Sequence, residues 1–230
     1  MDNIRDLFSS IAPKYDLLNT ALSLGIDRQW RRQAVQFLKG SRNVLDLCAG
    51  TLAVSREIFR INSNATVTAV DFSQEMLEWG LKRLPSQFRS RIRIQCSDFY
   101  KFVSPPGSFD GVICAYGMRN LVDNPAALQR IHQLLRPSGL FVVLEFFRPD
   151  RWYTWLWHLT YAQCVMPMIG RIVSRRRDAY KHLRDSVRGF YTLDRYAELL
   201  RENRFGVKVA KRLTGGISGL IVAEKPSPPK

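Results

Sequence analysis

The chain has 230 residues, 46% of them hydrophobic and 24% charged, and its 35 Lys and Arg against 20 Asp and Glu give a net charge of +15. This length and composition exclude a disordered chain and predict one ordered domain with a full core. The positive net charge says nothing about the fold, but it is compatible with a nucleic acid or an anionic membrane surface as a binding partner. It is equally compatible with a basic protein that binds neither.

Residues 1–43 precede the first predicted core strand and are expected to form short helices. Asp27 is predicted to cap one of these helices. The apolar stripe of that helix comprises Trp30, Ala34, Phe37 and Leu38. The segment is expected to cover the sheet, and its periodicity leaves open whether it also forms a lid over a bound cofactor.

The N-terminus and the cysteines indicate the compartment. Residues 1–10 carry acids and no apolar stretch typical of a signal peptide, so we expect a cytoplasmic protein. The cysteines lack CxxC spacing and are expected to be buried free thiols, with no disulfide, zinc site or other bound metal. They are Cys48, Cys96, Cys114 and Cys164.

The stretch 44–51, VLDLCAGT, predicts a buried strand that enters a tight turn at Gly50 and Thr51. A second apolar run, 65–70, ends at Asp71. The order of strand, glycine turn, helix, strand and acid is typical of a βαβ unit that binds a nucleoside, with the acid on the ribose hydroxyls.

Strands and helices alternate through the rest of the chain, which predicts an α/β fold with a doubly wound, mostly parallel sheet of seven strands and helices on both faces. Ser73 and Thr192 are predicted helix caps, and so is Asp123 or its neighbour Asn124. Further strands are expected at 92–95, 109–115, 140–146, 205–210 and 217–223, and helices at 53–61, 73–84, 124–135 and 192–203. Residues 1–224 are expected to form one domain and 225–230 a disordered tail.

Residues 151–190 interrupt this rhythm and are expected to form an insert. Its first part, 152–173, is aromatic and nearly free of charge, and 171–188 holds seven Lys or Arg against two acids. Pro167 and Gly170 argue against a membrane span. Aromatic residues beside a basic cluster favour a membrane interface or a lipid pocket, and an ordinary pair of buried helices is the alternative.

Polar residues after later strands complete the expected cofactor site. Ser97 and Asp98 follow the third strand, where an acid is well placed to accept the adenine amine. The turn at 48–52 lacks the G-x-G-x-x-G spacing that a pyrophosphate requires, and no P-loop lysine follows. A cofactor with ribose and adenine but no phosphates fits better, which indicates S-adenosylmethionine.

Several stretches carry a family pattern. They are IRDLFSSIAPKYDLLNTALSLGIDRQWRR, VLDLCAGT, AVDFSQEML, FDGVICAYGMRNL, LLRPSGLFVVLEFFRP and LTGGISGLIVAEK. Over almost its whole length the chain resembles the ubiquinone/menaquinone biosynthesis C-methyltransferases, which are class I S-adenosylmethionine-dependent enzymes with a Rossmann-like fold. The N-terminal stretch and the GMRN piece are specific to that family, whereas the glycine turn and the LRPSG turn occur in many methyltransferases.

The resemblance implies a reaction and a set of residues. The acceptor would be a polyprenylated benzoquinol or naphthoquinol methylated at a ring carbon, with Arg119 stabilising the forming phenolate and Asn120 holding the ring oxygen. Tyr116 would lie near the sulfonium of the cofactor. Taken alone, Arg119 would be interpreted as a surface ion-pair residue, and His132 as a packing or surface residue.

The chain departs from the family pattern at the turn itself. The family has GTGD where this chain has Gly50-Thr51-Leu52-Ala53, and Ala115 replaces a serine. A Cβ and an isobutyl group then enter a loop that approaches the methionine part of the cofactor, and a partner for its ammonium is lost. This leaves open a weakened enzyme that acts as a scaffold or regulator in a quinone-synthesis assembly.

The charge and the insert bear on partners. We expect peripheral contact with anionic lipid at the inner face of the cytoplasmic membrane and no nucleic-acid partner, because the basic cluster adjoins an apolar block. An RNA methyltransferase is the remaining alternative. The oligomeric state, a homodimer included, and the choice between benzoquinol and naphthoquinol stay open.

Overall fold

The structure is a computed structural model that describes residues 25–150 and 177–227 together with Ala12, 15–17, Asn19, Thr20 and Ser23; the side chains of 177–180 lie outside this description. The aromatic part of the predicted insert, 152–173, and Cys164 lie outside the described residues. None of the helices within the described ranges is long and apolar enough to cross a membrane.

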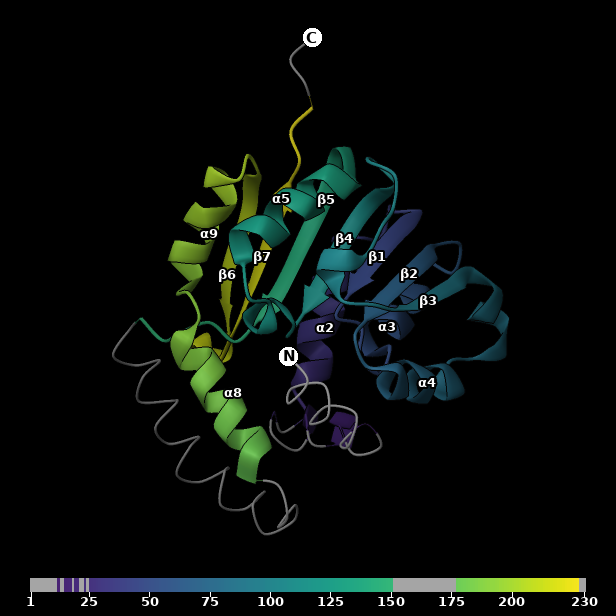
Figure 1. The fold of residues 1–230 in the computed structure, drawn as a ribbon, viewed down its shortest axis with the longest axis horizontal. Coiled ribbons are helices and arrows are strands. Elements are labelled where there is room, and N and C mark those ends of the chain that lie inside the picture. Colours follow the sequence, from purple (N-terminus) through teal and green to yellow (C-terminus); the bar gives the residue numbers. More distant parts are fainter. Residues whose placement is uncertain are drawn as a thin grey trace.

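A seven-stranded sheet forms the centre of the molecule, in the order β3-β2-β1-β4-β5-β7-β6 (Figure 1). The first five strands run parallel, and β7 is antiparallel to both of its neighbours. The strands are β1 (Asn43–Leu47), β2 (Thr66–Asp71), β3 (Ile92–Cys96), β4 (Phe109–Ala115), β5 (Leu135–Glu145), β6 (Gly206–Leu213) and β7 (Ser218–Glu224). The predicted fold class, with its mostly parallel sheet, is confirmed.

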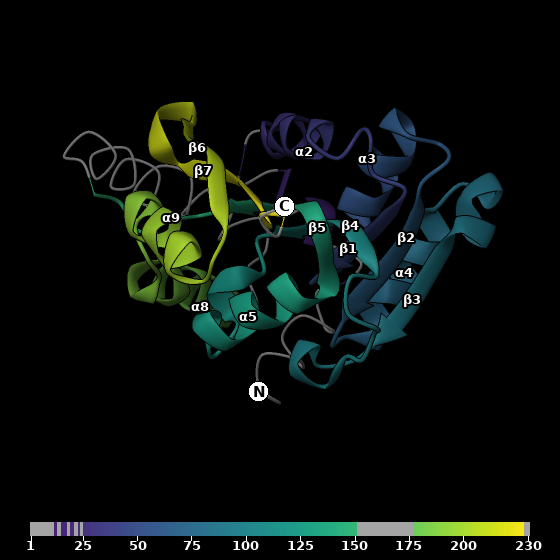
Figure 2. The same cartoon turned by 90° about the horizontal axis from the view of Figure 1, so that it is seen from above.

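Helices cover both faces of the sheet because the central strands carry apolar residues on both sides. Figure 2 shows α2 and α3 on one face and α5, α8 and α9 on the other. Each face has its own apolar core. The helices are α2 (Asp27–Gln36), α3 (Ala53–Ile61), α4 (Gln74–Arg83), α5 (Asn124–Leu134), α8 (Arg177–Gly189) and α9 (Leu193–Glu202), with short 3₁₀ helices η1 (Ser86–Arg91), η2 (Phe99–Lys101), η3 (Met118–Asn120) and η5 (Thr214–Gly216).

The predicted caps form where a short polar side chain precedes the helix. Ser73, Asp123 and Thr192 each accept a hydrogen bond from a backbone N–H in the first turn of α4, α5 and α9. The prediction for Asp27 is wrong, because this residue lies inside the first turn of α2. Its buried carboxylate instead accepts a hydrogen bond from the Ser23 hydroxyl and pairs with Arg31.

Three further predictions need correction. The helix α2 ends at Gln36, and Phe37 is 39% exposed, so the apolar stripe does not include it. Strand β5 begins at Leu135 instead of 140, because Leu135 pairs with Phe109 before a shift in register. Lys225, expected in a disordered tail, exchanges backbone hydrogen bonds with Ser138 and Gly139 next to it, and 228–230 lie outside the described residues.

The described cysteines are free thiols, as expected, but their burial differs. Cys114 is buried and Cys48 half-buried, whereas Cys96 is exposed at the end of β3. Strand β3 lies at the edge of the sheet and has no fully buried residue, so its end is open to solvent.

Candidate cofactor and substrate site

A cavity of about 560 Å³ lies where the carboxyl ends of β1, β2, β3 and β4 meet. This is the edge at which open α/β sheets bind ligands, and the volume is within the range of small-molecule sites. The cavity is lined by all six residues predicted to bind the cofactor and by the predicted substrate residue Asn120. The six are Gly50, Thr51, Asp71, Ser97, Asp98 and Tyr116.

The turn after β1 depends on left-handed backbone at several positions. Gly50 has φ of 49°, and a Cβ there would lie 3.3 Å from the Cε of Met76. Its N–H donates a 2.8 Å hydrogen bond to one oxygen of Asp71, and the N–H of Ser73 donates to the other at 2.9 Å. These bonds join the β1 turn to the end of β2 and fix the Asp71 carboxylate at the cavity.

Asp71 fits the role of a ribose ligand. Burial raises the pKa of its carboxyl, although backbone N–H groups of Ser73, Gly50 and Phe72 oppose this shift. A carboxylate has about four lone-pair positions, and these backbone groups use three of them. The carboxylate can therefore still accept a hydroxyl donor from the cavity, which is the chemistry that a ribose offers.

Ser97 and Asp98 follow β3 and lie next to Asp71, because the Ser97 N–H donates a 2.9 Å hydrogen bond to the Asp71 carbonyl oxygen. The Asp98 side chain accepts a 2.9 Å hydrogen bond from the N–H of Tyr100 and so begins η2. The Ser97 hydroxyl donates to the carbonyl oxygen of Asp98. This fixed carboxylate borders the cavity and retains lone pairs that an exocyclic amine can use.

The structure shows how the turn accommodates Leu52, for which the resemblance predicts a glycine. Leu52 has φ of 58° and ψ of 26°, so it adopts the left-handed conformation itself. Its side chain is fully buried against Ala69 and Leu77 and does not line the cavity. The isobutyl group therefore does not obstruct the space that the cofactor would fill. The cost of a leucine at this position is instead the strain of its left-handed backbone.

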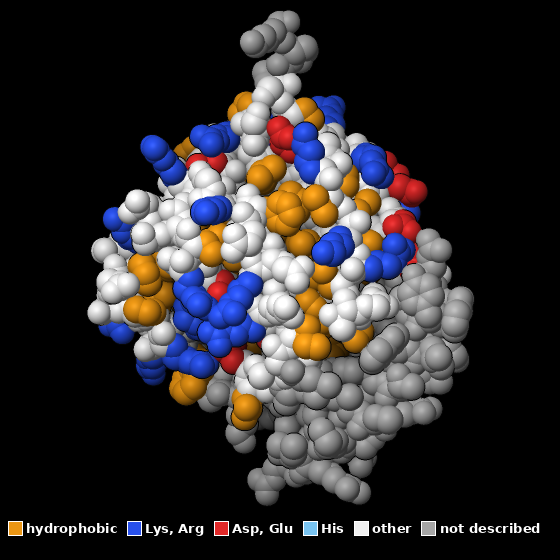
Figure 3. All heavy atoms as spheres, turned by 180° about the vertical axis from the view of Figure 1, so that it is seen from behind, with side chains coloured by type: hydrophobic (Ala, Val, Ile, Leu, Met, Phe, Trp, Pro, Cys, Tyr) orange, Lys and Arg blue, Asp and Glu red, His pale blue; other side chains and the backbone are white. Residues whose placement is uncertain are grey.

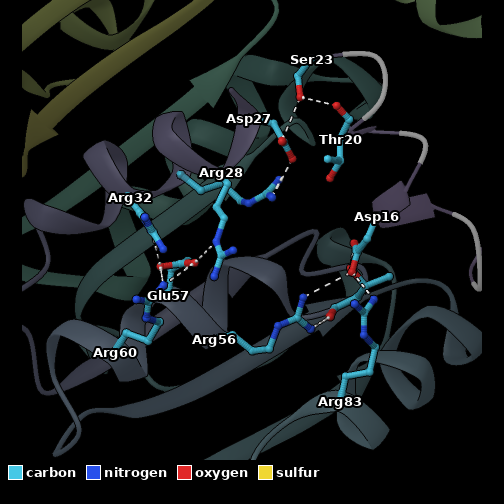
Figure 4. A network of polar contacts seen from close by, with 12 residues as sticks. Asp16, Thr20, Ser23, Asp27, Arg28, Arg32, Arg56, Glu57, Arg60 and Arg83 are labelled. Carbon is cyan, nitrogen blue, oxygen red and sulfur yellow. Dashed lines mark hydrogen bonds and ion pairs between the residues drawn. The ribbon is translucent and has the colours of Figure 1, made fainter. Parts of the chain in front are cut away.

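The N-terminal segment supplies a carboxylate at the same turn. Asp16 lines the cavity and accepts a 2.5 Å hydrogen bond from the Thr51 hydroxyl. It also pairs with Arg56 of α3 and Arg83 of α4, and Arg56 donates to the Thr51 carbonyl (Figure 4). This cluster connects the cover segment, the turn and two helices.

Tyr116 and Phe146 form an aromatic wall. Tyr116 has φ of 62°, which turns its ring onto Phe146 with 4.6 Å between ring centroids. Burial raises the pKa of Tyr116 well above its usual value, so its hydroxyl stays protonated. The residue contributes a neutral aromatic surface to the cavity, which suits a cationic ligand group.

Arg119 is buried and paired. Its guanidinium lies 2.5 Å from a Glu145 oxygen and donates to the carbonyl oxygen of Tyr116 at 2.7 Å, and it does not line the cavity. Burial lowers the pKa of Arg119, but the Glu145 carboxylate more than offsets this, so the net shift is upward. Arg119 is thus a buried cation behind the wall and not a surface ion-pair residue.

Asn120 is the neighbour of Arg119 that reaches the cavity. Its side-chain oxygen lies 3.0 Å from Nε2 of His182 on α8. The sequence analysis assigned no role to His182, because nothing in the sequence indicates that a residue 62 positions away packs against the GMRN piece. His132, in contrast, packs edge-on against Phe205 away from the site, as expected.

The sequence analysis also missed Asp46, which lies on β1 directly before the turn. Its carboxyl is buried and accepts a 2.6 Å hydrogen bond from the Ser55 hydroxyl of α3. Burial raises the pKa of Asp46 to about 7. An acid inside the apolar run VLDL was the available signal, because a buried carboxyl requires a partner.

Comparison with known proteins decides the family. The model of the ubiE/COQ5 methyltransferase family matches residues 1–225. The chain belongs to this family. It is 37% identical over 230 residues to the ubiquinone/menaquinone biosynthesis C-methyltransferase UbiE of Geotalea uraniireducens, covering 97% of each chain, and 36% identical over 224 residues to the demethylmenaquinone methyltransferase of Deinococcus radiodurans, covering 96% of this chain and 92% of that one.

Solved structures of low sequence identity share the fold of this ubiE/COQ5 family member. The [4+2]-cyclase SpnF matches with a TM-score of 0.70 at 13% identity, covering 97% of this chain and 95% of its own. Human N-acetylserotonin methyltransferase, solved with S-adenosylmethionine, matches with a TM-score of 0.58 at 19% identity, covering 93% and 58%. These matches confirm the predicted methyltransferase fold, but a fold that also hosts a cyclase does not by itself define the reaction.

Proposed function

We propose that this protein transfers the methyl group of S-adenosylmethionine to a ring carbon of a polyprenylated quinol in quinone biosynthesis. The observation that carries the proposal is that Asp71 and Asp98, the acids expected to bind adenosine, line the same cavity as Asn120 of the GMRN piece. Membership of the ubiE/COQ5 methyltransferase family supports the reaction class. The scaffold alternative is not favoured, because Leu52 leaves the cavity open.

Different residues of the cavity bind different parts of the cofactor. Asp71 holds the ribose hydroxyls and Asp98 the adenine amine, while the Gly50 turn allows close approach of the backbone. S-adenosylmethionine supplies an electrophilic methyl group, and the protein holds the acceptor carbon in line with it, which contributes several kcal/mol to the barrier reduction without a metal. Tyr116 excludes water and faces the positively charged sulfonium of the cofactor.

Asn120 and Arg119 act on the acceptor. The ring carbon becomes nucleophilic when the quinol hydroxyl gives its proton to a base, directly or through water, so negative charge develops on that oxygen. The Asn120 amide donates a hydrogen bond to the oxygen. Arg119 is paired with Glu145 and does not line the cavity, so it acts indirectly, as a buried charge that offsets part of the negative charge on that oxygen. After the transfer the cofactor leaves as S-adenosylhomocysteine, and the methylated ring carbon loses its own proton to restore the aromatic ring.

A membrane surface fits the acceptor, because a polyprenyl chain partitions into lipid. Figure 3 shows a dense group of Lys and Arg side chains on the face that carries α2 and α3. There the exposed Arg28, Arg32 and Arg60 surround the single carboxylate of Glu57 (Figure 4). The surplus of positive charge favours anionic lipid by about 1 kcal/mol for each well-placed residue.

Methyl transfer is tested by incubating the protein with S-adenosylmethionine labelled in its methyl group and with demethylated benzoquinols and naphthoquinols in detergent. Label in one lipid class is expected, and Asp71→Asn should weaken cofactor binding at least tenfold in calorimetry. A protein that binds the cofactor but labels neither quinol would contradict the proposal. Label in added RNA would favour the RNA methyltransferase instead.

Membrane contact is tested by flotation with anionic vesicles at low salt. The wild-type protein should float, and a variant with Arg28, Arg32 and Arg60 all replaced by Gln should float less. Neutral vesicles are the matched control. Wild-type protein that stays at the bottom with anionic vesicles would exclude this contact.

A further inference from the structure

The contact between α8 and η3 joins a histidine to the residue that faces the acceptor. His182 lies at 3.0 Å from the Asn120 oxygen, and Asn120 lines the cavity. The imidazole is half-buried, so solvent competes only in part for this hydrogen bond. Within the described residues, the side-chain nitrogen of Asn120 makes no hydrogen bond to protein.

We propose that His182 is a positioning residue that donates a hydrogen bond from Nε2–H to the Asn120 oxygen and thereby directs the Asn120 amide N–H groups toward the acceptor oxygen. An asparagine side chain can turn over and present either its oxygen or its nitrogen. Only the nitrogen stabilises a forming phenolate. The inference rests on the proposed function, because the acceptor oxygen is the group that the amide meets.

The surroundings of His182 hold it in the neutral form that this role uses. Burial and the positive charge of Arg119 lower its pKa, and Asp185 on the same helix acts in the opposite direction. A neutral imidazole has one N–H and one lone pair, and the Asn120 oxygen selects the tautomer with hydrogen on Nε2. Arg119 is the charged residue that faces it from η3, so protonation of His182 would bring two positive charges together.

The alternative role is that of a general base, in which the histidine takes the proton of the quinol hydroxyl itself. The two roles separate cleanly with one conservative substitution. Gln carries an N–H donor but cannot act as a base at neutral pH, whereas Ala carries neither. His182→Gln should therefore retain most of the wild-type kcat, while His182→Ala should lower kcat about tenfold to a hundredfold, the effect of one hydrogen bond to a charged group.

The acidity of the acceptor gives a second measurement. With a series of quinol analogues of decreasing phenol pKa, the loss in His182→Ala should shrink, because a more acidic hydroxyl needs less stabilisation of its anion. The cofactor Kd from calorimetry should change less than threefold. His132→Ala on α5 is the matched histidine control and should leave kcat unchanged. The wild-type protein must first show transfer to a quinol, and without it both proposals fail together.

A measurement that needs no activity reads the tautomer directly. In wild-type protein labelled with ¹⁵N at histidine, the spectrum of His182, assigned by its loss in His182→Gln, should show hydrogen on Nε2 and none on Nδ1 at pH 7.5. Hydrogen on Nδ1 would overturn the inference. So would an inactive His182→Gln variant that folds normally, or a His182→Ala variant with wild-type kcat in an enzyme that methylates the quinol.

Discussion

Leu52 offers a direct test of how the cofactor turn is built, because two substitutions separate its backbone strain from its buried side chain. Leu52→Ala removes the isobutyl group but keeps a Cβ at φ of 58°, whereas Leu52→Gly removes both. Ala normally stabilises a chain relative to Gly. At this position the order should be reversed, because a left-handed residue with a Cβ costs about 1–2 kcal/mol that glycine does not pay.

The magnitudes follow from the burial of the side chain. Leu52 is fully buried among Ala69 and Leu77, so its truncation to Ala should lower the free energy of unfolding by about 2–5 kcal/mol. Leu52→Gly loses the same contacts but relieves the strain, and it should be about 1 kcal/mol more stable than Leu52→Ala. Both variants should be less stable than wild type, because the lost burial exceeds the relieved strain.

Urea unfolding followed by circular dichroism measures all three proteins under one condition. Leu77→Ala is the control for a lost apolar contact in the same cluster without any strain. A Leu52→Ala variant as stable as Leu52→Gly would show that residue 52 carries no left-handed strain. Because Leu52 does not line the cavity, cofactor affinity in a folded Leu52→Gly variant should stay within severalfold of wild type.

Three other perturbations test buried groups of the site. Burial raises the pKa of Asp46 to about 7 from an ordinary value of 3.8, so the native state holds a proton that the unfolded chain loses between about pH 4 and about pH 7. The free energy of unfolding should therefore fall by up to about 4 kcal/mol as pH rises over this range, and urea unfolding of Asp46→Asn should lack this slope. Gly80→Ala would place a Cβ 2.5 Å from the backbone of the cofactor turn, so thermal scans should show destabilisation of at least about 2 kcal/mol, whereas Gly189→Ala, with open space around it, should not. Glu145→Gln should cost about 3 kcal/mol in urea unfolding, because it leaves the Arg119 charge buried without its counter-ion, and no loss would refute the importance of the pair.

The parts of the site that follow from local rules could be predicted from the sequence. The Gly50 turn and Asp71 end adjacent parallel strands, so their meeting at one edge follows from the topology, and Gly50 indeed donates to Asp71. Ser73 caps α4 for an equally local reason, since its side chain reaches the first turn of its own helix. Such features need only a few neighbouring residues and the order of the strands.

Contacts between distant segments could not be predicted in this way. Asn120 and His182 are 62 positions apart, and their meeting depends on how α8 packs beside η3. Lys225 carries no apolar pattern, yet its ammonium donates to the carbonyl oxygens of His132 in α5 and Leu135 in β5, which fixes a residue that composition alone places in a disordered tail. Both cases are decided by tertiary packing, which periodicity does not encode.

At Leu52 and Ala53, too, a local feature could be predicted from the sequence, whereas the contact with a distant segment could not. The resemblance predicts that a glycine and an acid of the family pattern are absent at the methionine end. The structure turns Leu52 into the core and brings the carboxylate of Asp16 to the turn from the N-terminal segment, 2.5 Å from Thr51. Because Arg56 binds both Asp16 and the Thr51 carbonyl, the cover segment and the turn share one ion cluster. The position of Asp16 and the shape of the cofactor turn are therefore coupled, and a substitution at Asp16 would act on the turn and on the ion cluster.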